Sequence, residues 1–221
     1  NVFPVPDGDT GTNMSLTIES VVGNLARLPT GADGAEIRKA ITTGALMGAR
    51  GNSGVITSQI LRGLCEGAQG AEAFNAATVA AAFAKAVEVA FQAVRKPVEG
   101  TILTVLRDAA AAAKNAAEEE LETDAALDAI VAEAYASVQR TPDLLPVLKE
   151  HGVVDAGGFG LAILFDAFAA ALLGRAGTMV DELSFARGAH PKVEIEQVND
   201  WEGSQYRYCN EFLVDSDSLD R

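Results

Sequence analysis

Basic residues are scarce in this chain: 17 Lys and Arg stand against 31 Asp and Glu, which leaves a net charge of −14. Nucleic-acid phosphates and anionic membrane surfaces both require a basic footprint on the protein. We therefore expect no nucleic-acid partner. A nucleotide is not excluded, because Mg²⁺ can carry the attraction between carboxylates and phosphates.

Aromatic residues make up only 6% of the chain, although 48% of it is hydrophobic. The core must therefore be built from aliphatic side chains and alanine, and such small residues favour close packing of helices. The length of 221 residues suits one large domain or two small ones.

Cysteine is limited to Cys65 and Cys209, which lie far apart in the sequence and form no disulfide framework. A reducing, cytoplasmic compartment is the expectation. Apolar runs stay below the roughly 18 to 20 residues of a membrane span, and no signal peptide is visible. We therefore expect no integral membrane segment. His151 and His190 are expected to be structural or exposed rather than catalytic.

Strand-forming patterns are rare before residue 190, which predicts an all-α fold. Apolar residues recur at helical spacing in eight segments that start near residues 14, 37, 53, 78, 101, 127, 142 and 161. Classical phosphate loops follow a strand, and neither their lysine nor their glycine pattern is present. Residues 190–221 contain two strand-like stretches. We predict a domain over 1–189, and a linker with the start of a truncated β-containing domain over 190–221.

The most informative motif is Asn1-Val-Phe-Pro-Val-Pro-Asp7-Gly-Asp9-Thr10-Gly-Thr12-Asn13-Met14. Two carboxylates lie among glycines, just before a helix whose first N–H groups attract anions. This combination suits a metal–phosphate complex, although a turn with a helix cap gives the same residues. The spacing does not match an EF-hand loop, and Pro4 and Pro6 argue against an aspartyl nucleophile at the end of a strand.

Four glycine-rich breaks each lead into an apolar helix: residues 1–13, 48–54, 99–101 and 155–158. If these helix starts converge, they surround one anion with positive helix ends. Strict alternation of helices would not bring them together, so either a short connection breaks it or the helix count is off by one between 124 and 155. Individually, Gly51–Gly54 can be a tight turn with Asn52 or Ser53 as cap, and Thr101 and Asp155 can be N-caps.

Taken together, these motifs resemble the nucleotide-binding domain of bacterial fatty acid kinases, which belongs to the dihydroxyacetone-kinase L-type family. The resemblance covers residues 1–190 and rests on the first motif, Gly48–Gly54, Glu99–Thr101 and Gly152–Gly158. It implies a DhaL-like, eight-helix antiparallel barrel that binds ATP and Mg²⁺ at one mouth. It also implies a homodimer in the full-length protein.

The resemblance implies roles for individual residues. Asp7 and Asp9 match metal ligands that are central to catalysis, and Asn1 falls at the position of a third aspartate. The residues matched to nucleotide binding are Thr10, Thr12, Asn13, Met14, Gly51, Asn52, Ser53, Gly54, Thr101, Asp155 and Gly157.

The implied reaction is phosphoryl transfer to the carboxylate of a fatty acid, which a separate fatty-acid-binding, DegV-like protein presents. A carboxylate is already ionised at neutral pH and needs no general base, in agreement with the absence of a histidine near the motif. Two alternatives stay open: a kinase for a small ketose such as dihydroxyacetone, and a non-catalytic nucleotide-sensing module.

Overall fold

The computed structural model describes residues 2–4 and 6–175. The chain divides into two units, Asn1–Leu183 and Ser184–Arg221, and the second lies wholly outside the described residues, as do the strands predicted after residue 190. All regular elements in the described part are α-helices, so the all-α prediction is confirmed. None of its helices combines the length and the apolar character that crossing a bilayer requires.

Seven long helices and one short one make up the described part. They are α1 (Thr10–Leu25), α2 (Gly34–Gly48), α3 (Gly51–Gly67), α4 (Ala76–Gln92), α5 (Ile102–Glu118), α6 (Thr123–Leu144), α7 (Pro146–Glu150) and α8 (Ala156–Leu172).

The predicted helix start at Pro142 is wrong, because Pro142 lies inside the last turn of α6. A proline within a helix leaves the carbonyl four residues earlier without its backbone donor. Here that carbonyl belongs to Val138, and the hydroxyl of Thr141 donates to it at 2.7 Å. This substitute bond lets α6 continue past the proline, and α7 starts instead at Pro146.

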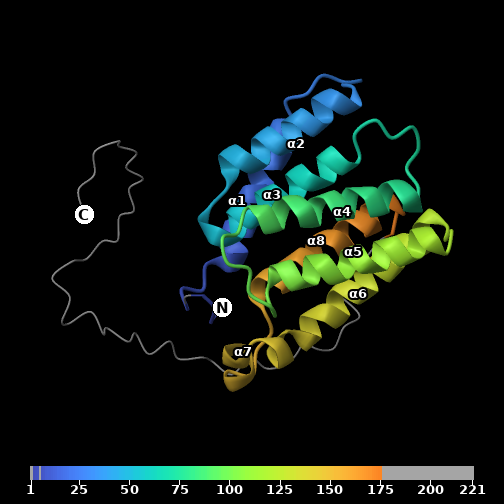
Figure 1. Ribbon diagram of the computed structural model, residues 1–221. Coiled ribbons are helices and arrows are strands. Elements are labelled where there is room, and N and C mark those ends of the chain that lie inside the picture. The colour runs from blue at the N-terminus through green and yellow to red at the C-terminus, as the bar shows by residue number, and fades with distance from the viewer. Residues whose placement is uncertain (1, 5, 176–221) are drawn as a thin grey trace, which may run out of the picture. The chain divides into compact units, whose positions relative to one another are not determined.

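Helices α1 to α6 run back and forth, and α7 is a single short turn between α6 and α8 (Figure 1). Because α7 is too short to cross the array, α8 begins at the end where α1, α3 and α5 also begin. α8 then packs against α1, α5 and α6, and it lies behind α4 and α5 in Figure 1. The short connection therefore resolves the conflict with strict alternation.

Small residues allow the helices to approach closely. A Cβ atom on Gly63 of α3 would lie 2.4 Å from Cα of Ala86 on α4, and one on Gly44 of α2 would lie 2.8 Å from Cα of Val21 on α1. Several alanines of the core are completely buried, Ala86, Ala90, Ala109 and Ala134 among them. The core is thus built largely from alanine and aliphatic side chains, as the low aromatic content predicts.

We predict that Gly63→Ala destabilises the fold by about 1–3 kcal/mol, because the new methyl group meets backbone atoms that cannot yield. The matched control is Gly23→Ala on α1, where a Cβ has no neighbour within 4 Å. This control should stabilise the protein by up to about 1 kcal/mol through helix propensity. Urea unfolding followed by circular dichroism measures both effects, and equal midpoints for the two variants would contradict the close α3–α4 contact.

Candidate functional site

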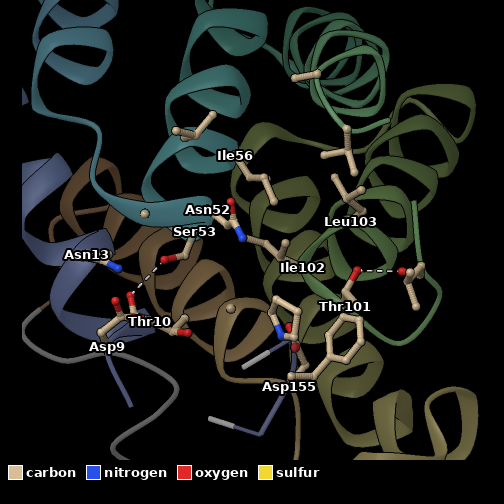
Figure 2. A pocket seen from close by; sticks show the side chains of 18 of the residues that line it. Asp9, Thr10, Asn13, Asn52, Ser53, Ile56, Thr101, Ile102, Leu103 and Asp155 are labelled. Atoms are coloured by element: carbon tan, nitrogen blue, oxygen red, sulfur yellow. Dashed lines mark hydrogen bonds between the residues drawn. The ribbon is translucent and has the colours of Figure 1, made fainter. Parts of the chain in front are cut away.

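A cleft of about 620 Å³ opens where α1, α3, α5 and α8 begin (Figure 2). All four glycine-rich breaks contribute to its walls, together with the segment between α4 and α5. The described residues that line it include Phe3, Pro4, Asp7, Asp9, Thr10, Asn13, Gly51, Asn52, Ser53, Val55, Ile56, Arg95, Lys96, Val98, Thr101, Ile102, Leu103, Asp155 and Gly157.

The acidic wall of the cleft comes from the turn before α1. Asp7 and Asp9 are exposed, and the backbone N–H of Asp9 donates to Oδ1 of Asp7 at 3.3 Å. Asp9 occupies the N-cap position of α1, but its side chain makes no capping bond. The turn therefore places two carboxylates beside a helix N-terminus whose donors the cap residue leaves unused.

The start of α3 is held tightly against α1. Ser53 Oγ donates to the carbonyl oxygen of Thr10 at 3.4 Å, as the dashed line in Figure 2 shows. Gly51 has a φ of +57°, and a Cβ there would lie 2.4 Å from Nδ2 of Asn13. Only glycine accepts both this backbone conformation and this proximity without strain.

Four helices begin at the cleft, and in three of them the N-cap residue makes no side-chain capping bond. The N-cap residues Asp9, Arg50 and Thr101 make no capping hydrogen bond. Thr101 instead donates its hydroxyl to the carbonyl of Val98 at 2.7 Å. Asn52 and Ser53 lie within the first turn of α3, so the prediction that one of them caps this helix is wrong.

Other helices of the described part give the comparison. Asp33 caps α2 within a capping box, and Asn75 caps α4. Because α6 also lacks a side-chain cap, a missing cap alone indicates nothing. What distinguishes α1 and α3 is that their uncapped starts share one cleft, where their partial positive charges add.

Asp155 is the buried acid of the cleft. Its side chain accepts a hydrogen bond from the N–H of Gly158 at 2.7 Å and caps α8, as one of the two interpretations of the sequence predicts. Its own N–H donates to Oγ1 of Thr141 at 3.0 Å. Burial raises the pKa of the Asp155 carboxyl, and hydrogen bonds from the N–H groups of Gly158 and Ile102 oppose this shift. One carboxylate thus connects the starts of α5 and α8.

A metal ion would find its ligands on the acidic wall. In the described part of the chain, no group of three His, Cys, Asp or Glu side chains is placed to hold a metal. Mg²⁺ is commonly bound by only one or two carboxylates together with substrate phosphates. Asp7 and Asp9 fit that mode, in which the metal arrives with the nucleotide.

Most of the predicted site residues meet at this cleft. The exceptions in the described part are Thr12, Met14 and Gly54, which do not line it. Met14 is buried, and a Cβ on Gly160 would lie 2.8 Å from its sulfur, so Met14 packs against α8. Asn1 lies outside the described residues.

Sequence reasoning missed Arg95 and Lys96, which line the cleft from the segment between α4 and α5. They form an adjacent basic pair just before Pro97 and the break at 99–101. In a chain with a net charge of −14, such a pair beside a predicted anion site was a signal available in the sequence.

We predict that the stability of Asp155→Asn relative to the natural protein increases with pH, because Asn removes a buried charge while it keeps one acceptor oxygen for Gly158. Because the pKa of Asp155 is raised in the fold, its ionisation costs stability above that pKa, and the cost disappears as pH falls towards the ordinary aspartate value. The advantage of Asp155→Asn should therefore shrink as pH falls.

Asp155→Ala is the comparison variant, and it should lose about 0.5–2 kcal/mol with the cap. Urea unfolding at several pH values measures all three proteins. An advantage of Asp155→Asn that grows towards acidic pH would contradict the assignment.

Comparison with known proteins shows the family of this chain. The model of the family described as DAK2 domain matches residues 4–170. The chain is 45% identical over 219 residues to the uncharacterized protein SH1689 of Staphylococcus haemolyticus, covering 97% of this chain and 39% of that protein. It is 43% identical over 224 residues to protein YloV of Bacillus subtilis, covering 100% of this chain and 40% of that protein. The chain thus spans about two fifths of the length of these relatives. Because the family model covers most of the chain, this protein belongs to the DAK2 domain family.

Proposed function

We propose that this domain binds ATP with Mg²⁺ and transfers the γ-phosphoryl group to the carboxylate of a fatty acid presented by a separate, DegV-like fatty-acid-binding protein. One observation carries the nucleotide part of the proposal: the uncapped starts of α1 and α3 share a cleft with Asp7 and Asp9. The kinase-related DAK2 family supports it. The fatty acid part rests on the motif resemblance.

The protein would bind the phosphates mainly through its backbone. First-turn N–H groups of α1 and α3 point towards the mouth of their helices, where an anion gains from both the donors and the helix dipoles. The hydrogen bond from Ser53 to the Thr10 carbonyl links these two starts, and the close approach of Gly51 to Asn13 keeps them near each other. A phosphate would therefore meet donors that are already in place, so little reorganisation is needed during transfer.

Asp7 and Asp9 would hold the magnesium ion that accompanies the phosphates. When bound, Mg²⁺ neutralises charge on the phosphate oxygens during transfer. The chain's own contribution is to keep both carboxylates on one turn, where the Asp9 N–H bond to Asp7 restrains them.

The remaining wall of the cleft is apolar, with Val55, Ile56, Val98, Ile102 and Leu103. Such a surface accommodates a flat base or an acyl segment and excludes water from the reacting groups. No histidine lines the cleft in the described part of the chain. A carboxylate acceptor suits this composition, because it is already ionised and requires no base.

We predict that ATP binds to this chain only with Mg²⁺, and that Asp7→Ala and Asp9→Ala each weaken binding at least about tenfold, since each removes a charged ligand. Titration calorimetry with and without Mg²⁺ measures the dissociation constant. Glu72→Ala, at an exposed position between α3 and α4 that does not line the cleft, is the control for loss of one acid. Binding that is equally tight without Mg²⁺ or in Asp7→Ala would contradict the metal assignment.

We predict that phosphoryl transfer from ATP depends on the carrier protein. Oleate bound to a DegV-like fatty-acid-binding protein should be phosphorylated, and trapping the acyl phosphate with hydroxylamine measures the product. Free oleate and dihydroxyacetone are the comparison acceptors. Transfer to free oleate at a comparable rate would contradict the need for a carrier, and transfer to dihydroxyacetone alone would favour the ketose kinase.

A further inference from the structure

We propose that Arg95 and Lys96 form a cationic wall of the cleft that binds the polyphosphate of the nucleotide. This inference rests on the proposed function, because it assigns further binding residues to the same site. Among the described residues that line the cleft, these two are the cations, and both are exposed.

These cations differ from most others in the described part because they make no ion pair. Arg62, Lys85, Arg107, Lys114, Arg140, Lys149 and Arg175 each lie within 4 Å of a carboxylate oxygen. Arg50, at the start of α3, donates instead to the carbonyl oxygen of Ala49 at 2.9 Å. Arg95 and Lys96 thus face the cleft with their charge uncompensated, in a chain where acids greatly outnumber bases.

The nearest acid in sequence, Glu99, is held by other groups. Its Oε2 accepts hydrogen bonds from Nη2 of Arg107 at 2.9 Å and from Oγ1 of Thr104 at 2.8 Å. The bond from Arg107 and then that from Thr104 lower the pKa of Glu99, which keeps this carboxylate ionised and engaged with α5. Glu99 is therefore not available to neutralise the basic pair a few residues before it.

The charges expected in the occupied cleft indicate a role for Arg95 and Lys96. Asp7 and Asp9 contribute two negative charges, which one Mg²⁺ offsets, and a nucleoside triphosphate then adds about four more. Partial charges at the helix starts compensate only a fraction of that excess. Two side-chain cations in the lining of the same cleft reduce it directly, and the planar guanidinium of Arg95 suits bidentate contact with phosphate oxygens.

The test compares Arg95→Ala/Lys96→Ala with Arg27→Ala/Lys39→Ala. The control removes the same two charges from exposed positions that do not line the cleft. Calorimetry uses Mg–ATP, Mg–ADP and AMP at one ionic strength. We expect the Kd for Mg–ATP to rise about tenfold or more in the cleft variant, less for Mg–ADP and not for AMP. The control should stay within about twofold, since its charges are screened from the cleft.

A charge-conserving variant, Arg95→Lys/Lys96→Arg, keeps the proposal testable if the alanine variant folds poorly, and it should bind Mg–ATP nearly as the natural protein does. If the natural protein binds Mg–ATP and the alanine variant has the same Kd, the proposed function stands and the proposal of a cationic wall is overturned. A rise confined to the KM for the carrier-bound acid also overturns it, because the pair then recognises the acceptor. Natural protein that binds no Mg–ATP overturns the proposed function and this inference with it.

Arg107 acts as a positioning residue in this scheme, because it occupies Glu99. Arg107→Ala should raise the Kd for Mg–ATP although Arg107 does not line the cleft, since Glu99 is then released next to the basic pair. Adding Glu99→Gln to Arg107→Ala should restore binding. If the ion pair between Arg107 and Glu99 is only structural, adding Glu99→Gln should not restore binding. The Kd for Mg–ATP would then stay raised or rise further.

Discussion

The cleft depends on a buried connection between one hydroxyl and one carboxyl group. Thr141 donates to the Val138 carbonyl that Pro142 leaves without a backbone donor, and it accepts from the N–H of Asp155. Asp155 in turn accepts from the first turns of α8 and α5. The end of α6 and the starts of two cleft helices are therefore fixed to one another through two side chains. A buried network of this kind is stable only when each of its polar groups has a hydrogen-bond partner. The residues at positions 141, 142 and 155 therefore constrain one another.

Close helix packing sets the rest of the geometry. Glycines on α2 and α3 leave room for the neighbouring helices at distances that any larger residue would block. Buried alanines serve the same purpose on α4 to α6. Because these contacts involve backbone atoms, the helices have little freedom to shift, and the four starts stay in register at the cleft. The stiffness of the array and the geometry of the proposed anion site thus have the same origin in residue size.

Much of this could be predicted from the sequence, because helical periodicity and glycine-rich breaks are local signals. The four breaks converge because α7 is short, and the local sequence pattern did not indicate this. Pro142 suggests a helix start, but it lies inside α6, where the Thr141 hydroxyl donates to the carbonyl that the proline leaves without a donor. Asn52 and Ser53 are residue types that favour N-cap positions, but α3 begins at Gly51 with Arg50 as its N-cap. Arg95 and Lys96 were not predicted as site residues, although the pair lies close in sequence to the break at 99–101, and the fold shows that their loop lines the cleft.

The uncapped start of α3 has a consequence for how such a domain can evolve. A serine or aspartate at position 50 would supply the missing cap and gain roughly 1 kcal/mol. It would also occupy the donors that an anion needs, and an aspartate would repel that anion as well. Arg50 avoids both effects, at a cost in helix stability. Under the proposed function, variants selected only for heat resistance would gain a cap at residue 50 and lose affinity for the anion, so thermal stability and binding trade against each other at this residue.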